Sequence, residues 1–354
     1  MSAERHLYSH IFNIVVFAVG GAAFVLLMRN LGLDNARRVF ADAGAWLAVV
    51  VGLDLATMAC DAAAIHAFMR PEARMVSYLR VLAAQASGRA INIFVPGGVV
   101  GETTKVTMLV SHAPRDRVVS SIVLYNLATL YISVAIVIIG VPITTALVDL
   151  PHELAIAAWV GLGVVVAFVV ALAIIIHRGA LGTLLASVTS LRLVSPARAE
   201  RWRARFIELD RHIKELQSDQ SPGTRLGLGL LACSRVISWA ATTTVLYAVG
   251  VHLTLTLLVG VLSVGVLIGW ISAFVPFGLG LADGSNYALF DVLGASGAHG
   301  VFVTLLGRAR TLTIALVGLV VMAIGHTINR ISVAHRNRRL AQARLAKPSP
   351  GALT

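Results

Sequence analysis

The chain has 354 residues, of which 57% are hydrophobic and only 13% are charged, and its formal net charge is +12. A soluble domain of this length cannot cover its surface with so few charged side chains, so the composition excludes a soluble enzyme or a soluble binding module. The Lys and Arg residues lie mostly in loops and tails, which is typical of cytoplasmic loops facing anionic lipid headgroups and argues against nucleic-acid binding.

Long apolar runs predict an all-α polytopic membrane protein. They exceed the roughly 18 residues that cross a bilayer, and they do not alternate in polarity as transmembrane β-strands do. In the first half of the chain they are Ile11–Met28, Gly44–Met69, Val119–Gly140 and Ala155–Ile176. The first run contains Gly20-Gly21 and is followed by no convincing small-residue cleavage site, so we expect a retained helix and not a signal peptide.

The longest polar segment runs from His177 to Arg225. Within it, Ser195-Pro196 has the pattern of a helix N-cap followed by proline at the first helical position. Apolar residues then recur at four- and three-residue spacing on one face of an otherwise charged helix, namely Trp202, Phe206, Leu209, Ile213 and Leu216. This pattern predicts an amphipathic helix that lies either on the cytoplasmic membrane surface or against the protein's own loops.

The second half contains three more long apolar runs and ends in a basic tail. The runs are Leu226–Val249, Thr254–Val275 and Val301–Ile328. A moderately polar stretch through Asp291 separates the last two runs. We expect the basic tail, residues 331–354, to be cytoplasmic.

Two interruptions rich in Pro and Gly resemble each other and indicate an internal repeat. Residues 94–98 and 274–278 share the pattern Phe-Val-Pro-x-Gly, and each is followed by a carboxylate, Glu102 or Asp283. Proline removes a backbone donor and glycine loosens the backbone, so a helix must break at each place. Irregular backbone is tolerated at membrane depth only where protein or a water-filled cavity surrounds it. We therefore expect the two breaks to face each other or a shared cavity.

Loop charges predict how these segments meet the membrane. Arg residues flank segment 78–110 on both sides, so this segment is expected to be a re-entrant hairpin that enters and leaves on the cytoplasmic side. The basic tail is also expected on the cytoplasmic side, so the last helix must run toward the cytoplasm. Segment 254–298 must then start and end on the outer side of the membrane, as a second hairpin. The alternative in which Thr254–Val275 crosses the membrane fully stays open. One observation disagrees with the predicted topology: it places Arg29, Arg37 and Arg38 on the outer side, whereas basic residues favour the cytoplasmic side.

The predicted architecture is about six full transmembrane helices plus two re-entrant helical hairpins in an inverted repeat, eight hydrophobic segments in all. It divides the chain into an N-terminal membrane half (1–177), a basic connector (178–224), a C-terminal membrane half (225–330) and the tail. We expect a multi-pass protein of the inner (plasma) membrane with both termini in the cytoplasm. Inverted repeats with broken helices are a recurring plan of transporters.

Ionisable residues inside apolar helices are costly unless they are paired or hydrated, which makes them functional candidates. Asp54 and Asp61 lie two turns apart on one face of a predicted helix, and the repeat places Arg235 at a position related to that of Asp54. We therefore predict a buried Asp54–Arg235 pair, with local pairing or snorkelling of each charge as the alternative.

The residues around the two breaks form the candidate set for binding a headgroup along a translocation path. Glu102 is expected either to cap a helix or to bind a proton or the cationic part of a headgroup, and the cap alternative also holds for Asp283. The neighbouring cations are expected to hold a phosphate, or else to snorkel to the interface. The set comprises Arg89, Asn92, Pro96, Gly97, Gly98, Gly101, Glu102, Lys105, Pro276, Gly278, Gly280, Asp283, Arg308 and Arg310.

No pattern in the sequence predicts catalysis, a metal site or a cofactor. Cys60 and Cys233 lie inside apolar helices and are interpreted as packing residues. There is no nucleophile–base pair, no Gly-rich phosphate loop and no His/Cys/carboxylate set with metal spacing, so we expect no enzyme activity.

The sequence around both breaks resembles a known family. Arg89-Ala90-Ile91-Asn92, Pro96-Gly97-Gly98 and Gly101 to Lys105 are similar to the "N…P…GGE…R" signature of the lysylphosphatidylglycerol synthase transmembrane region, also called the flippase-like integral membrane protein family. Pro276 to Asp283 is similar to that family's "P-x-G-x-G…E" element, although the acid is Asp here and extra residues separate Gly98 from Glu102. The resemblance covers roughly residues 10 to 330.

This resemblance implies the movement or handling of lipids. Because the chain has no counterpart of the soluble aminoacyl-transferase domain of bifunctional members, we do not expect it to synthesise lysyl-lipids. We expect a lipid flippase or lipid-transport protein whose partners are membrane lipids with a polar or anionic headgroup. Two alternatives stay open: a secondary transporter for a small solute, and a membrane subunit that anchors or regulates a lipid-modifying or glycosyltransferase enzyme.

Overall fold

The structure, a computed structural model, describes residues 33–94, 99–148, 152–178, 222–273, 275, 278 and 280–345. Within these ranges the regular structure is entirely helical. The predicted first helix, Ile11–Met28, and the predicted amphipathic helix of the connector lie outside the described residues.

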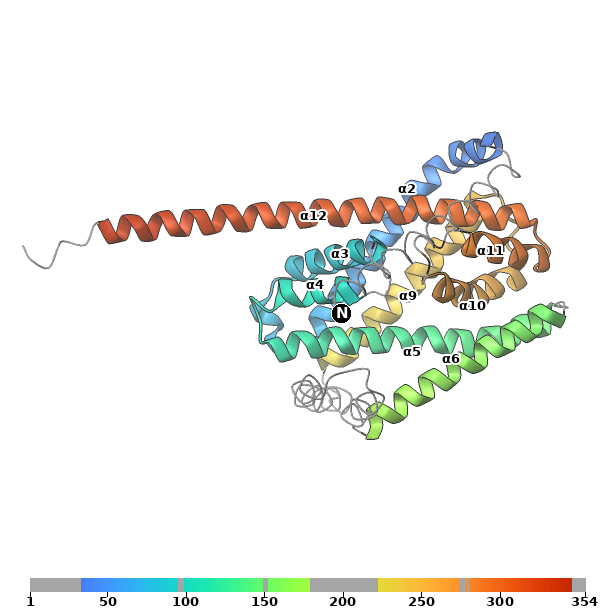
Figure 1. Ribbon diagram of the computed structural model, residues 1–354, viewed down its shortest axis with the longest axis horizontal. Helices are drawn as coiled ribbons and strands as arrows, with labels where there is room; N and C mark the ends of the chain where they lie inside the picture. Colours follow the sequence, from blue (N-terminus) through green and yellow to red (C-terminus); the bar gives the residue numbers. More distant parts are fainter. Residues whose placement is uncertain are drawn as a thin grey trace, which may run out of the picture.

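The central element is an antiparallel pair of helices, α2 (Leu33–Phe68) and α9 (Pro222–Ala248). At one end of the pair, the ring of Phe68 lies directly over Gly227, where a Cβ atom would come within 2.3 Å of the ring. At the other end, Ala43 and Val50 share a buried cluster with Val245. The two helices therefore run side by side over most of their length (Figure 1).

Two native cysteines allow a test of the packing of α2 against α9. Cys60 on α2 and Cys233 on α9 are free cysteines that lie close to each other across the helix pair. We expect oxidation with copper-phenanthroline in membranes to link them within one chain, detected as a linked peptide pair by mass spectrometry and absent from a Cys60→Ser variant. Free reaction of both thiols with maleimide, without any linkage, would contradict the register of α2 and α9.

Two short helices, α3 (Tyr78–Phe94) and α4 (Val99–Leu109), pack against each other as a hairpin. At 1.5 Å per residue they are about 25 and 16 Å long, so neither reaches across a hydrocarbon core of about 30 Å. Gly88 and Gly101 allow the close approach, since a Cβ atom at Gly101 would lie 2.2 Å from the carbonyl oxygen of Gly88. The predicted break is confirmed in that α3 ends and α4 begins there, while residues 95–98 themselves are not described.

A second hairpin consists of α10 (Leu255–Ser272) and α11 (Leu281–Val292). Thr254 caps α10, because its hydroxyl oxygen accepts a hydrogen bond from the Leu257 amide at 3.2 Å. The start of α10 packs against the end of α11, where Leu293 fills the space above Gly260. This hairpin opens toward the end of the molecule opposite to the end where the α3–α4 hairpin opens (Figure 1).

Each hairpin packs against a long helix from the other half of the chain. The first of these helices, α5 (Arg115–Leu147), brings Gly140 against Ser263 of α10, and the second, α12 (Gly297–Leu345), brings Gly318 against Ala86 and Ala90 of α3. Both contacts involve small residues, which let the helix backbones approach closely. Each half of the chain thus supplies a long helix that packs against the hairpin of the other half. The remaining helix, α6 (His152–Arg178), lies against α5.

The predicted apolar runs that fall within the described residues are helices, and the chain is a multi-pass membrane protein by their length and composition. Among the described residues, five segments are long and apolar enough to cross a membrane: Ala43–Phe68, Arg115–Leu147, Pro222–Ala248, Leu255–Ser272 and Gly297–Ile324. Because α10 is among them and the 12-residue α11 is not, the choice between a full crossing and a hairpin limb for α10 stays open. The last helix is longer than predicted and continues to Leu345.

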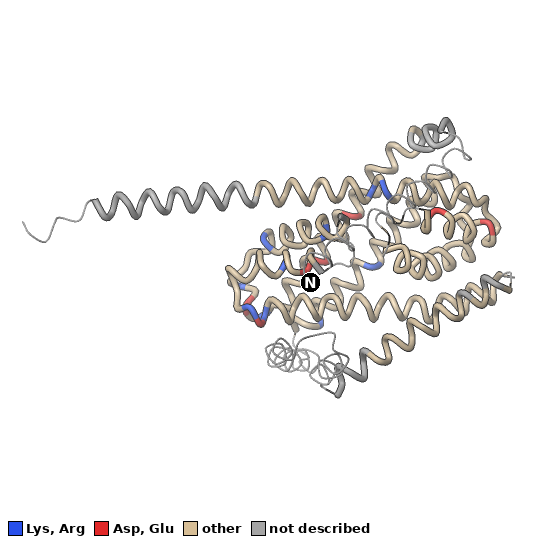
Figure 2. The backbone as a smooth tube through the Cα atoms, viewed as in Figure 1, with Lys and Arg blue, Asp and Glu red and all other residues tan. Residues whose placement is uncertain are grey.

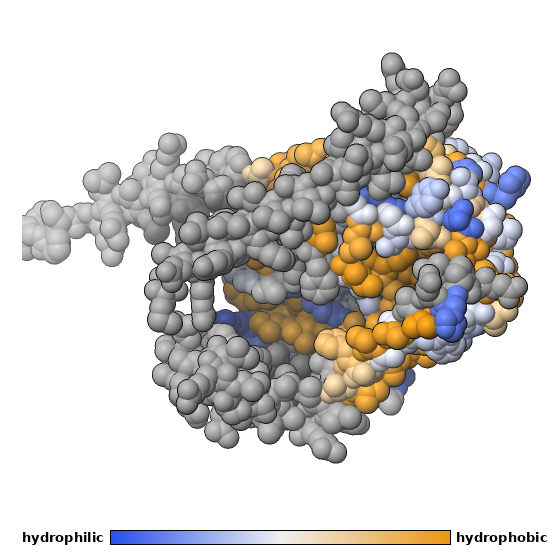
Figure 3. Space-filling view, turned by 45° about the vertical axis from the view of Figure 1, so that its right-hand side comes forward, coloured by the Kyte–Doolittle hydropathy of each residue, from blue (hydrophilic) through white to orange (hydrophobic). Residues whose placement is uncertain are grey.

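The surface matches a membrane environment. Large hydrophobic side chains are exposed along α5, α6, α10 and α12, with Ile139, Val164, Leu255 and Leu316 each at least 60% exposed. Figure 3 shows the hydrophobic surface that such residues form. The described Lys and Arg residues gather mainly at the end where α2 ends and α5 begins (Figure 2), including Arg70, Arg74, Arg80, Arg115 and Arg117.

Candidate functional site

A polar cavity of about 200 Å³ lies among the apolar helices α2, α3, α4, α5 and α9. The side chains that line it come from segments far apart in the sequence, and five of them are charged. The lining consists of Thr57, Asp61, Gln85, Arg89, Asn92, Glu102, Lys105, Tyr125, Asn126, Thr129, Arg235 and Ser238. Polar and charged groups are costly inside a membrane protein, so this cavity is the candidate functional site.

Glu102 is the centre of a hydrogen-bond network at the mouth of this cavity. Its Oε1 atom accepts from the Lys105 ammonium at 2.7 Å and from the Asn92 amide at 3.5 Å, and its Oε2 atom accepts from the Asn126 amide at 3.0 Å. The side chain is 29% exposed, so the carboxylate reaches the surface of the protein. The described contacts of Glu102 are with side chains of α3, α4 and α5.

Lys105 is buried and held from two sides. Its side chain is only 5% exposed, and besides the Glu102 carboxylate it lies over the ring of Tyr125, 5.6 Å from the ring centroid. A cation over an aromatic face is attracted by the negative potential of the ring, which offsets part of the cost of burial. Gly88 makes room for the Lys105 stem, because a Cβ atom there would lie 2.6 Å from it.

Asn92 connects the two limbs of the α3–α4 hairpin. Its carbonyl oxygen accepts from the Gly101 amide at 2.8 Å, while its amide group points at Glu102. Asn92 therefore satisfies a backbone donor in the first turn of α4 and orients the acid with the other end of the same side chain.

The inner wall of the cavity carries a buried ion pair between α2 and α9. Arg235 donates to Asp61 at 3.0 Å, and the hydroxyl of Ser234 donates to the same carboxylate. Asp61 is only 3% exposed, so its charge depends on these donors. The predicted Asp54–Arg235 pair is therefore wrong, because the antiparallel register of α2 and α9 places Arg235 opposite Asp61, two turns from Asp54.

Arg89 differs from the other cations of the cavity. Lys105 and Arg235 each face a carboxylate, whereas no residue in the described part of the chain forms an ion pair with Arg89. Three cations and two carboxylates line the cavity, which leaves one net positive charge. An uncompensated guanidinium in a polar cavity can bind an anion such as a phosphate through two parallel hydrogen bonds.

The acid of the second break, Asp283, lies in a separate and fully buried cluster. Its Oδ2 atom accepts from Arg308 of α12 at 2.6 Å and from the amide of Gly280 at 2.9 Å, so it both caps α11 and pairs with a cation. Arg308 also donates to the carbonyl oxygen of Gly278 at 3.4 Å. Gly278 and Gly280 have φ angles of 61° and 77°, a region that favours glycine.

Asp54 pairs with Arg310 of α12 through two hydrogen bonds, one of them at 2.6 Å between Oδ1 and Nη2. Because Asp54 is only 2% exposed, this pair ties the buried face of α2 to α12. Asp54, Asp61 and Arg235 are thus each paired with a residue of an element distant in sequence.

The structure brings part of the predicted set together. Arg89, Asn92, Glu102 and Lys105 line the polar cavity, whereas Asp283, Arg308 and the two glycines of the second break form the other cluster. Pro96, Gly97, Gly98 and Pro276 lie outside the described residues. No group of three or more His, Cys, Asp and Glu side chains that could hold a metal ion occurs in the part of the chain that the structure describes.

Several lining residues were missed by the sequence analysis. Thr57 and Gln85 lie one helical turn before Asp61 and Arg89, and Thr129 and Ser238 lie about one turn after Tyr125 and Arg235. Polar residues spaced by three or four from an intramembrane charge share its helix face, and that spacing was the available signal.

Comparison with known proteins identifies one related family. The model of the lysylphosphatidylglycerol synthase TM region matches residues 13–318, a range that includes every residue of the polar cavity. The searches of curated proteins and of solved structures found no match.

Proposed function

The chain belongs to the family of the lysylphosphatidylglycerol synthase TM region, and from this membership and the polar cavity we propose that it is a lipid flippase or lipid-transport protein. It moves a lipid with an anionic headgroup across or within the inner membrane. Lipid-related function in an integral membrane protein follows from the family; the transport activity is our proposal.

The observation that carries this proposal is the net positive charge of the cavity at Arg89. Moving a charged headgroup through hydrocarbon is costly because it loses its water without gaining other partners. A cavity with a free guanidinium and several amides and hydroxyls replaces that water. Glu102 and Asn126 lie at the exposed side of the cavity and Asp61 at its buried side, which gives the headgroup a polar path inward.

The proposal also places the two hairpins in the membrane. We place the α3–α4 and α10–α11 hairpins as re-entrant elements that enter from opposite membrane faces, with the basic end of the molecule in the cytoplasm. The acyl chains stay in the bilayer along the exposed hydrophobic surface while the headgroup moves through the cavity. In this proposal the protein is a transporter and has no enzyme activity.

Reconstitution into liposomes tests the proposal. With fluorescent phosphatidylglycerol, phosphatidylethanolamine or phosphatidylcholine, the rate of leaflet exchange is measured by quenching the outer leaflet with dithionite. We expect wild-type protein to accelerate exchange of phosphatidylglycerol. Arg89→Gln is expected to slow it by about tenfold or more, because one charge-assisted contact to a phosphate contributes about 1.5–3 kcal/mol.

A matched control is Arg80→Gln, which removes the same charge from an exposed position near the start of α3. Arg80 does not line the cavity, so exchange should stay at the wild-type rate. Wild-type exchange no faster than that of protein-free liposomes for all three lipids would rule out the flippase. Equal loss in both Arg variants would show that Arg89 acts through general charge and not as a headgroup ligand.

A further inference from the structure

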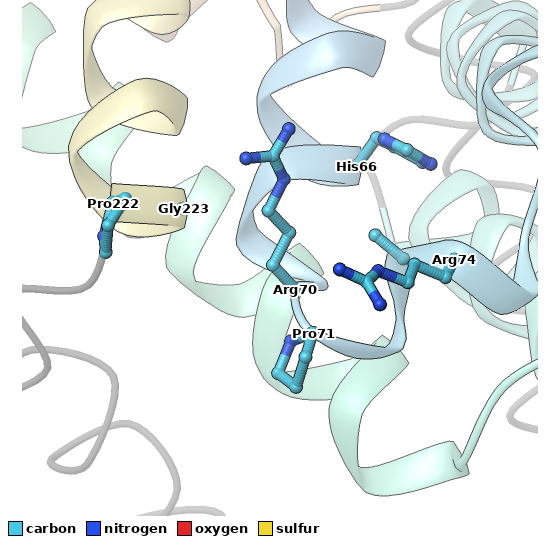
Figure 4. Close-up of a pocket in the computed structure, with 7 residues that line it drawn as sticks. His66, Arg70, Pro71, Arg74, Pro222 and Gly223 are labelled. Carbon is cyan, nitrogen blue, oxygen red and sulfur yellow. The ribbon is translucent and has the colours of Figure 1, made fainter.

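A second and larger cavity, of about 580 Å³, lies at the basic end of the molecule (Figure 4). It is lined by the last turn of α2, the turn that follows it, the 3-10 helix η1 (Glu72–Met75) and the start of α9. Its volume is within the range of about 300–1,000 Å³ that is usual for ligand sites. The lining residues are His66, Arg70, Pro71, Ala73, Arg74, Pro222 and Gly223.

The charges of this cavity are all of one sign. Arg70 and Arg74 project around the same space (Figure 4), and neither guanidinium forms an ion pair within the described part of the chain. No Asp or Glu occurs among the described residues that line the cavity, and Glu72, which lies between two of them in the sequence, is bound by Arg117 at 3.1 Å. Two guanidinium groups therefore face this cavity, and no carboxylate of the described lining neutralises them.

The wall of the cavity is fixed by packing. His66 donates from Nε2 to the carbonyl oxygen of Val76 at 2.9 Å, which holds the imidazole in place. The start of α9 lies so close to the end of α2 that a Cβ atom at Gly223 would come within 2.9 Å of the Ala67 carbonyl oxygen. The positive end of the dipole of this 27-residue helix thus lies in the same wall as the two arginines.

We propose that this cavity is a binding site for a phosphate-bearing anion at the membrane surface. Arginine matches the geometry of phosphate oxygens, and the helix N-terminus adds to the positive potential. The position at the end of the membrane-spanning part of α2 puts the site at the level of lipid headgroups. The inference does not depend on lipid movement, since no residue of this cavity lines the polar cavity around Glu102.

The two cavities share the α2–α9 pair. His66 lies five residues beyond Asp61 on α2, which is about 7.5 Å along the helix axis. Neighbouring turns of α2 therefore line the anion cavity and the buried side of the polar cavity.

Native mass spectrometry of the full chain in detergent tests the site, with phosphatidic acid, phosphatidylcholine and inorganic pyrophosphate titrated separately. We expect one phosphatidic acid molecule to bind to wild-type protein, and the dissociation constant to rise at least about tenfold in the Arg70→Gln/Arg74→Gln variant. The control variant Arg80→Gln/Arg115→Gln loses the same charge outside the cavity and should bind as wild type does. Arg70→Lys/Arg74→Lys keeps the charge and should recover part of the affinity.

The ligands identify the source of the phosphate. Binding of phosphatidic acid that depends on Arg70 and Arg74, and exceeds binding of phosphatidylcholine, supports a lipid headgroup site. Pyrophosphate binding with the same dependence, without lipid binding, supports a soluble phosphate compound as the ligand. Equal affinity of wild type and the Arg70→Gln/Arg74→Gln variant for both probes, with both proteins monodisperse, overturns the proposal.

Discussion

A Gly101→Ala variant is expected to lose most of the lipid-exchange activity and a substantial part of the thermal stability. The new Cβ atom would lie 2.1 Å from Oδ1 of Asn92 and 2.2 Å from the carbonyl oxygen of Gly88. The second contact is with backbone, which cannot move without separating α3 from α4. We expect a cost of about 3 kcal/mol, near the upper end for overpacking, and displacement of Glu102 from its hydrogen bonds.

The measurement combines thermal unfolding in detergent with the leaflet-exchange assay. Gly229→Ala is the matched control, because Gly229 is an exposed helical residue of α9 and a Cβ atom there meets nothing within 4 Å. It should leave exchange unchanged and raise stability slightly, by about 0.5–1 kcal/mol. If Gly101→Ala retains both wild-type exchange and wild-type stability, the close packing of α3 on α4 is not as the structure has it.

An Arg308→Leu variant is expected to destabilise the protein strongly. Asp283 is fully buried, and Arg308 lies 2.6 Å from its carboxylate. Removing one partner of a buried ion pair leaves an uncompensated charge, at a cost of about 3–5 kcal/mol. We expect the apparent melting temperature to fall by roughly 5–10 °C, with less folded protein recovered from membranes.

A second substitution distinguishes the two roles of Asp283, its ion pair with Arg308 and its hydrogen bond to the start of α11. In Asp283→Asn/Arg308→Leu the side-chain oxygen of residue 283 can still accept from the Gly280 amide, and no charge is left buried. The double variant should therefore be more stable than Arg308→Leu alone. A double variant that melts at or below the single one would show that Arg308 stabilises α11 by packing or by its other contacts and not by neutralising Asp283.

The helices were predictable because apolar length alone indicates a membrane span. The α9 and α10 helices match their predicted runs to within a few residues. The end of α12 was not predictable in the same way, since hydrophobicity falls after Ile328 while the helix continues to Leu345. No proline or glycine occurs between these positions, so helix propensity favours the continuation of the helix.

The sequence predicted which charged residues matter for the candidate site, but it did not predict which of them form ion pairs with each other. Charges in apolar runs are rare, so Asp54, Asp61, Glu102 and Arg235 stood out in the sequence. Their partners depend on how α2 and α9 are aligned and on where α12 crosses α2, and neither is encoded in local spacing. The Asp54–Arg235 prediction failed for this reason, because it assumed that positions related by the repeat also meet in space.

The exchange of packing partners between the halves has a consequence for biogenesis. During synthesis, the α3–α4 hairpin leaves the ribosome long before α12, which supplies Gly318 against α3 and Arg310 against Asp54. Until that last long helix inserts, one side of the early hairpin and a buried acid have no final neighbours. The membrane fold is therefore completed late and by the whole chain, and the first half cannot mature as an independent unit.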